Sequence, residues 1–309
     1  MRFHVGVTDN DWFEFLRRLG PDEVNFWIPS GREFSALEPG GPFLFKLHSP
    51  LNYIVGGGFF VRSERLPLSL VWEVFGEKNG AATRSEFERL IRNYRGQDEV
   101  DPEIGCIILN QPFFIPRDHW LPAPGNWKPN IVSGKTYSDE EQWGSHTWAL
   151  VRPWLPDPEP AEPSEEAIPA VAEPGRLYGQ EYLRQSRLGQ GAFRILVTDA
   201  YQKRCAISGE RTLPVLQASH IKPYGQGPNR VDNGLLLRSD LHILFDRGYL
   251  TVTPNLRVEI SRRIKEEYEN GRDYYRFHGN SLAVLPLSAI DCPSEDFLRW
   301  HNERIFRSR

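Results

Sequence analysis

Residues 153–175, PWLPDPEPAEPSEEAIPAVAEPG, are the segment that most constrains how this chain of 309 residues can fold. The segment is rich in Pro, Glu and Ala, and its apolar residues follow the period of neither a helix nor a strand. A segment of this kind cannot bury a core and is typical of a stiff, solvated linker. We therefore expect two domains, residues 1–152 and 176–309, joined by this linker.

Composition excludes several classes of protein. The hydrophobic content of 39% is enough to bury real cores. No apolar run approaches the roughly 18 residues that a membrane span needs, and the N-terminus lacks the apolar stretch of a secretory signal. We expect a cytoplasmic protein without a membrane partner. Cys106, Cys205 and Cys292 are widely spaced and odd in number, which favours reduced thiols over a disulfide framework.

Charge differs between the two expected domains. Residues 1–152 hold 16 Lys and Arg against 20 Asp and Glu, whereas residues 176–309 hold 21 against 15. The basic C-terminal domain suggests a polyanionic partner, although many basic surfaces contact only water.

The N-terminal domain has the pattern of an α+β fold. Helices are predicted at residues 11–19 and 83–94, the second with a Thr83/Glu86 capping box. Strands are predicted from β-branched and aromatic runs at residues 42–48, 52–61, 68–76 and 104–115. These elements predict a sheet or small barrel with two helices.

Tryptophan is concentrated before the end of the linker, where eight of the nine residues of this type lie. Most are expected to be core. Trp27 in NFWIPSG and Trp127 in PAPGNWKPN have loop-like contexts instead, and with Tyr137 they are our candidates for a pocket that stacks a base turned out of a duplex. Packing is the alternative reading of each.

Four stretches of this domain resemble the PUA-like superfamily of small β-barrels: NFWIPSGREF, GGPFLFKLHSPLNYIVGGGFFV, IGCIILNQPFF and NWKPNIVSGKTY. The likeness lies in strand order and aromatic placement. SRA, EVE and YTH members of the superfamily hold a modified base in an aromatic pocket. The resemblance therefore implies that residues 1–152 are a modified-base-recognition domain.

The C-terminal domain contains the segment QASHIKPYGQGPNRVDNGLLLRSDLHILFDRG, residues 217–248. An extended run and a Gly-, Pro- and Asn-rich loop lead to Asn233, and a short helix then ends at Gly248. On this helix His242 and Asp246 are four residues apart, so they project from one face. This spacing allows one imidazole and one carboxylate to bind a single divalent cation.

The ordered set of His220, Asn233, His242 and Asp246 resembles the signature of HNH nucleases, which have a ββα-metal fold. The flanking CAISG, ASHIKP, NGLLL and LHILFDRG are similar to the subgroup found in modification-dependent restriction endonucleases, over about residues 187–260. The resemblance implies that His220 is the general base, that Asn233 orients it, and that His242 and Asp246 bind the metal.

Two positions depart from the family pattern. Many members have a further metal ligand immediately before the base, where this chain has Ser219 with only a neutral hydroxyl. Many also carry paired CxxC zinc knuckles, whereas Cys205 is followed here by Ser208, so structural zinc is not expected. Arg187, Arg194 and Lys222 are candidates for contacts with the DNA backbone, and the alternative for each is plain exposure to solvent.

Together these features predict a two-domain α+β protein that acts as a modification-dependent endonuclease, with a role in restriction and defence against phage. Its expected cofactor is one divalent ion, Mg²⁺, Mn²⁺ or Ni²⁺. Its expected partner is double-stranded DNA with 5-methylcytosine or 5-hydroxymethylcytosine, cut by a homodimer. The alternatives are an HNH nuclease acting on RNA or unmodified DNA, and a catalytically silent sensor of modified nucleic acid.

Overall fold

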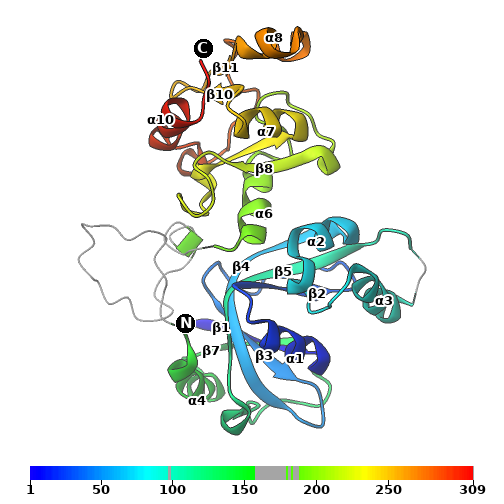
Figure 1. The fold of residues 1–309 in the computed structure, drawn as a ribbon. Helices are drawn as coiled ribbons and strands as arrows, with labels where there is room; N and C mark the ends of the chain where they lie inside the picture. Colours follow the sequence, from blue (N-terminus) through cyan, green and yellow to red (C-terminus); the bar gives the residue numbers. More distant parts are fainter. Residues whose placement is uncertain (97–98, 157–178, 180–181, 184–187, 309) are drawn as a thin grey trace. The chain divides into compact units, whose positions relative to one another are not determined.

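The computed structural model describes all residues except 97–98, 157–178, 180–181, 184–187 and 309 (Figure 1). Residues 157–175 of the expected linker and Arg187 lie outside the described residues. The chain divides into two compact units, Met1–Ala192 and Phe193–Arg309. No helix in the described part of the chain has the length and apolar character needed to cross a membrane.

The first unit combines a seven-stranded sheet with helices. Its main elements are β1 (Arg2–Thr8), α1 (Asn10–Leu19), β2 (Glu23–Ile28), β3 (Pro42–Leu47), β4 (Tyr53–Pro67), α2 (Leu68–Phe75), α3 (Arg84–Arg95), β5 (Glu103–Phe114), β6 (Leu121–Pro122), β7 (Gly134–Ser138) and α4 (Gln142–Val151). The strand order is β2-β5-β4-β3-β1-β7, with β6 paired to β4. Among the strands in the described part of this unit, only β1 and β3 pair in parallel. Among the described residues no pairing between β2 and β7 closes this sheet into a barrel.

Most elements predicted for this unit are confirmed, and one is wrong. Helix α3 begins after Thr83, whose hydroxyl accepts the backbone N–H of Glu86 as the capping box predicts. Residues 68–76, however, were predicted as a strand and instead form helix α2. The buried residues of α2 are Leu68, Val71 and Phe75, which are three and four positions apart and so lie on one helical face.

Aromatic side chains make up much of the core of the first unit. Trp12 and Phe13 of α1 pack with Phe43 and Phe45 of β3 in one buried cluster. Gly56 on β4 permits a close approach of the backbone of β5, because a Cβ at this position would lie 2.3 Å from the carbonyl oxygen of Phe113. The buried side chains of α1 therefore pack against residues of the sheet, and β4 and β5 approach each other closely.

The second unit places a two-stranded sheet next to a short helix. Its elements are the part of α6 (Gln190–Ala200) from Phe193 on, β8 (Leu216–His220), the 3-10 turn η5 (Val231–Asn233), β9 (Gly234–Arg238), α7 (Ser239–Asp246), β10 (Leu250–Val252), β11 (Val258–Ile260), α8 (Arg263–Tyr268), α9 (Arg272–Tyr275) and α10 (Glu295–Arg304). Strands β8 and β9 pair in antiparallel fashion, and so do β10 and β11. The order β8, β9, α7 is a ββα unit.

Burial fixes the orientation of α7. Leu241 and Phe245 are buried in the core of the second unit, together with the leucines of β9. Residues 242 and 246 are each displaced by one position from these anchors, so they project from a different side of the helix. Gly248, in the left-handed region with φ of 73°, follows the end of α7 as expected. The protein therefore presents the predicted ligand pair away from the core.

Candidate active site and aromatic cavity

His220 is the last residue of β8 and lies opposite Gly234, the first residue of β9. The imidazole is half-buried and stacks on the ring of Phe193, with centroids 3.9 Å apart and planes 10° from parallel. Its Nε2 atom is 2.7 Å from Oδ1 of Asn229. The ring is thus held by an aromatic face and by one amide oxygen.

The electrostatic surroundings of His220 include both residues of the predicted metal pair. Burial lowers the pKa of the His220 imidazole, and His242 lowers it further, whereas the hydrogen bond with Asn229 and the charge of Asp246 raise it. The net direction is downward, so the imidazole is neutral at neutral pH. The charges of His242 and Asp246 therefore both act on the His220 imidazole.

Asn233 is fully buried and binds the loop between β8 and β9. Its Oδ1 accepts the backbone N–H of Lys222 at 2.9 Å, and its Nδ2 donates to the carbonyl oxygens of Lys222 at 3.0 Å and Pro228 at 2.9 Å. The hydrogen bond to the His220 ring that we expected of Asn233 is made by Asn229 instead. No spacing rule singles out Asn229, since an Asn in a loop rich in Gly and Pro usually signals only a turn.

His242 and Asp246 face each other on α7, with Nε2 and Oδ2 3.1 Å apart. The side chain of His242 is 22% exposed and that of Asp246 56% exposed, so the pair is open to solvent. The other ring nitrogen of His242, Nδ1, lies 2.8 Å from Oε1 of Gln217 on β8. Gln217 is a second residue of the site that the motif does not include.

The donor chemistry of this pair fits a divalent cation. Nδ1 of His242 faces the amide oxygen of Gln217, which can only accept, so a neutral ring with its proton on Nδ1 presents the lone pair of Nε2 toward the carboxylate of Asp246. Two acceptors so placed need a proton or a cation between them, and a ligating His commonly donates its second ring N–H to a carbonyl in this way. No group of three or more His, Cys, Asp or Glu side chains within the described residues is placed to hold a metal. Water and phosphate oxygens would complete the coordination.

The remaining predicted residues of this unit have other surroundings. Ser219 is fully buried, and its hydroxyl donates to the carbonyl oxygen of His220 over a long 3.5 Å. Lys222 is half-buried and contributes its backbone to the contacts of Asn233. Arg194 is half-buried on α6. The contacts described for Ser219 do not involve His242 or Asp246.

The first unit contains an aromatic cavity of about 600 Å³, within the range of about 300–1,000 Å³ usual for ligand pockets. Six aromatic residues line it, namely Trp12, Phe26, Trp27, Phe34, Phe43 and Tyr94. Its polar lining includes His4, Asp9, Arg32, Glu33 and His48. A flat unsaturated ring with hydrogen-bonding edges is the ligand class that such a lining suits.

One of the three predicted pocket residues lines this cavity. Trp27 does so, and its Nε1 donates to the carbonyl oxygen of Asn79 at 2.9 Å, which orients the indole. Trp127 is not among the lining residues and lies under the Nζ of Lys46, 4.9 Å from the ring centroid.

Tyr137 also lies outside the cavity, for a reason set by strand geometry. Tyr137 pairs with Phe3 across β7 and β1, and the neighbouring pair is His4 with Thr136. Successive residues of a strand point to opposite faces, so Tyr137 stacks on Phe3 while His4 faces the cavity. Burial raises the pKa of the Tyr137 hydroxyl to about 12.

His4 is the most strongly perturbed group of the cavity. Burial lowers the pKa of its imidazole to about 4, and Nδ1 is 2.9 Å from Oγ1 of Thr136. The ring lies edge-on to Phe34 at 4.8 Å and tilted to Phe43 at 5.1 Å. The cavity therefore holds a neutral imidazole at neutral pH, which can hydrogen-bond a ligand without attracting an anion.

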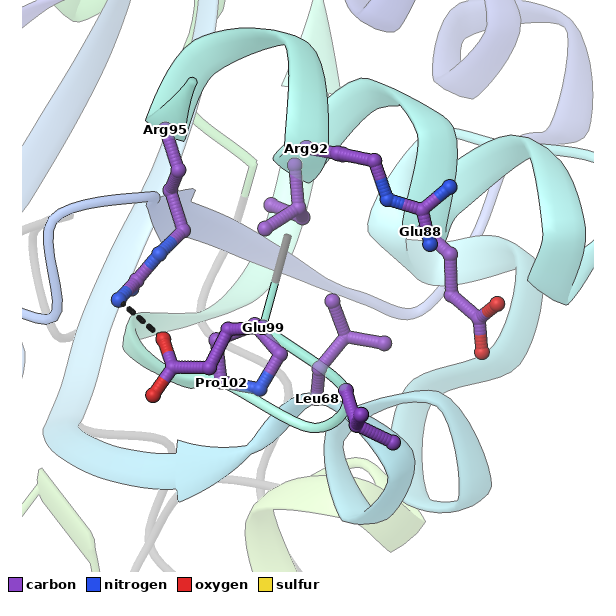
Figure 2. Close-up of a pocket in the computed structure, with 8 residues that line it drawn as sticks. Leu68, Glu88, Arg92, Arg95, Glu99 and Pro102 are labelled. Carbon is purple, nitrogen blue, oxygen red and sulfur yellow. Dashed lines mark hydrogen bonds and ion pairs between the residues drawn. The ribbon is translucent and has the colours of Figure 1, made fainter. Parts of the chain in front are cut away.

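A second hollow in the first unit is far smaller. Figure 2 shows it between α3 and the segment before β5, where Arg95 points toward Glu99 and forms an ion pair of 2.8 Å. Its volume of about 20 Å³ has room for about one water molecule. We assign it no function.

Comparison with known proteins bears on both units. Residues 205–253 match the family model described as HNH endonuclease. The chain is similar to the solved structure of ASCH from Zymomonas mobilis, with 15% identity over 46% of this chain and 94% of that chain and a TM-score of 0.32. It is also similar to the modification-dependent TagI restriction endonuclease, with 14% identity over 86% of this chain and 61% of that chain and a TM-score of 0.27.

None of the proteins with curated functions matches the chain. The family match and the ββα unit of β8, β9 and α7 coincide on the same segment, so residues 205–253 resemble an HNH endonuclease domain in both sequence and local fold.

Proposed function

We propose that the protein is a metal-dependent DNA endonuclease that cuts DNA containing a modified cytosine. The observation that carries the proposal is the grouping of a neutral imidazole, His220, with the His242–Asp246 pair in an HNH domain. An aromatic cavity in the other unit supplies a separate place for a base. The two units supply cutting and selection respectively.

The chemistry assigned to His220 is proton abstraction from water. A neutral imidazole takes a proton from water as the water oxygen forms a bond to phosphorus, and the P–O bond to the leaving sugar oxygen breaks. The leaving oxygen is then protonated by solvent, and the imidazolium returns its proton to solvent. The lowered pKa of His220 keeps the base unprotonated at neutral pH.

HNH endonuclease domains generally use a divalent metal. In this chain Nε2 of His242 and the carboxylate of Asp246 would hold it, with Gln217 fixing the ring of His242. A bound Mg²⁺, Mn²⁺ or Ni²⁺ supplies electrostatic stabilisation of the extra negative charge on the phosphate. Residues Arg194 and Lys222 are proposed to contact the DNA backbone.

The aromatic cavity is proposed to hold a 5-substituted cytosine turned out of the duplex. Aromatic stacking supports this proposal, since each stacked base contributes about 1–3 kcal/mol. Trp27 is the lining residue already oriented by a hydrogen bond. The neutral imidazole of His4 and the carboxylate of Asp9 are polar groups of the lining that can contact the edge of a base.

Digestion of matched DNA tests the proposed function. Duplexes of one sequence with cytosine, 5-methylcytosine, 5-hydroxymethylcytosine or glucosylated cytosine are incubated with the protein and Mg²⁺, Mn²⁺ or Ni²⁺. We expect cutting of at least one modified duplex, little cutting of the unmodified duplex, and none after chelation of the metal.

Other outcomes of this digestion identify the alternatives. Equal cutting of modified and unmodified duplexes, or cutting of RNA alone, would remove the modified-base proposal and leave the nuclease. Binding of modified DNA without cutting at any metal would identify a silent sensor. Because one HNH site cuts one strand at a time, the proposal expects double-strand breaks to depend on two protomers, which a concentration series of linearised plasmid measures.

A further inference from the structure

We propose that Asn229 is a positioning residue that holds His220 in the tautomer protonated at Nε2, which leaves Nδ1 as the nitrogen that accepts the proton of water. This inference rests on the proposed function of His220. It concerns a residue that lies outside the four-residue HNH signature. The amide oxygen of Asn229 takes a role in this chain that the motif would give to Asn233.

The contact that carries the inference is short and directional. Oδ1 of Asn229 is an acceptor, and it lies 2.7 Å from Nε2 of His220. An amide oxygen cannot donate, so the proton of a neutral imidazole held in this contact lies on Nε2. The second nitrogen, Nδ1, then has the free lone pair, which is the property a general base requires.

The loop around Asn229 is built to keep its side chain in place. Asn229 is only 5% exposed, and the carbonyl oxygen of the preceding Pro228 accepts the Nδ2 of Asn233 at 2.9 Å. Asn233 also binds both backbone groups of Lys222, at the start of the same loop. Asn233 therefore stabilises the loop, and the loop presents Asn229 to the imidazole.

The opposite face of the site limits the ring further. Phe193 stacks on the His220 imidazole, with centroids 3.9 Å apart and planes 10° from parallel. Rotation of the imidazole about its Cβ–Cγ bond tilts it out of this plane and breaks the stacking. A flip of 180° about its Cβ–Cγ bond would move Nε2 away from Asn229. The stacking and the hydrogen bond thus select one orientation of the ring together.

The other histidine of the site has the reverse arrangement, which strengthens the assignment. In His242 the amide oxygen of Gln217 contacts Nδ1, and Nε2 is turned toward Asp246. When both rings are neutral, the two carboxamides therefore favour opposite tautomers of the two imidazoles. His242 presents Nε2 as a ligand, and His220 presents Nδ1 as a base.

The experiment combines nuclear magnetic resonance with kinetics on the full chain. Ring ¹⁵N spectra of the protein labelled at its eight histidines show which nitrogen of His220 is protonated, with the signals assigned by a His220→Gln variant. Three proteins are compared: wild type, Asn229→Leu, which has no acceptor, and Asn229→Asp, which keeps an acceptor oxygen. Nicking of modified plasmid with Mn²⁺ gives kcat and KM for each. Asn280→Ala, an exposed Asn of the same unit, is the matched control.

We expect His220 of the wild type to be protonated at Nε2 and unprotonated at Nδ1. Asn229→Leu should lose this preference and lower kcat on the order of 10- to 100-fold with KM unchanged, as for other residues that orient a functional imidazole. Asn229→Asp should keep the Nε2 proton and recover most of kcat. Asn280→Ala should resemble wild type in both measurements.

The inference is overturned if wild-type His220 carries its proton on Nδ1, if Asn229→Leu keeps the wild-type kcat, or if the Asp variant is as impaired as the Leu variant. The last result would show that Asn229 only supports the folded loop and does not act through its acceptor oxygen. The ¹⁵N signals of the other histidines show whether each variant is still folded, because these signals stay unchanged only in a folded protein. If the wild-type protein cuts no nucleic acid, the proposed function fails, while the ¹⁵N spectra still decide the role of Asn229.

Discussion

The two sites of this protein are assembled from the chain in different ways. The proposed nuclease site takes His220, His242 and Asp246 from one segment that runs through β8, β9 and α7. The aromatic cavity takes its lining from residues as far apart as His4 and Ser133. The first site is polar and open, with Asp246 56% exposed, whereas six aromatic side chains line the second.

This difference has a physical origin. A metal and a base need a few atoms at short range, and a hairpin followed by one helical turn can supply them locally. A cavity that encloses a flat ring needs walls on several sides, and a single strand or helix provides only one wall. A local substitution is therefore expected to disable the nuclease site, whereas the cavity should respond to several distant substitutions by smaller amounts.

The largest effect is expected from His220→Ala. Loss of the general base should lower the rate of nicking about 10²- to 10⁴-fold, while binding of modified DNA to the other unit stays unchanged. Plasmid nicking and fluorescence anisotropy measure the two properties. His278→Ala, at an exposed histidine of the same unit, is the control and should cut normally. Loss of both binding and cutting would show that the two sites are not separable.

The second effect concerns pH, because each unit buries one neutral imidazole. Burial lowers the pKa of His4 in the first unit and of His301 in the second to about 4. An unfolded histidine titrates near 6.5, so as pH falls below this value the unfolded chain binds a proton that the folded protein does not accept until about pH 4. The free energy of unfolding is therefore highest above pH 6.5. It should fall by about 3 kcal/mol for each unit between pH 7 and pH 4.

Calorimetry of the wild type, His4→Gln and His301→Gln at pH 7 and pH 4.5 checks this expectation. Each variant should flatten the pH dependence of the transition of its own unit, whereas His146→Gln, at an exposed histidine, should not. If each unit of the wild type had the same free energy of unfolding at both pH values, these rings could not be buried in the neutral form.

The smallest effect is expected from a single wall of the cavity. Trp27→Ala should weaken binding of modified DNA about 10- to 100-fold, since one stacking contact contributes about 1–3 kcal/mol. Cutting of unmodified DNA at high protein concentration should not change. Trp72→Ala is the matched control, because Trp27 and Trp72 both contact the ring of Phe87 and only Trp27 lines the cavity. Equal losses in both variants would indicate destabilisation of the unit in place of lost recognition.

Prediction from sequence succeeded where the signal was local. The helix after Thr83, the end of α7 before Gly248 and the placement of His242 beside Asp246 all depend on residues within a few positions of one another. Residues 68–76 show the limit of such reasoning, because an apolar run with β-branched residues fits a strand or a helix until its buried partners are known.

The candidate sites follow the same rule. Trp27 was predicted as a pocket residue from its loop-like context and does line the cavity, although it lies on strand β2. Tyr137 and Trp127 had similar contexts, but the register of β7 with β1 and the contact with Lys46 place them elsewhere. Asn229 and Gln217 could not be found from sequence, because each acts through one hydrogen bond to a residue 9 or 25 positions away.

The order and spacing of His220, Asn233, His242 and Asp246 in the sequence were enough to predict an HNH-like segment, because these four residues lie within one short stretch, and the family match falls on the same stretch. Tertiary structure alone decided which amide holds which imidazole and which aromatic rings enclose a cavity. These choices depend on side chains that meet only when strands pair and helices pack, and packing brings together residues whose separation along the chain contains no information about their contact.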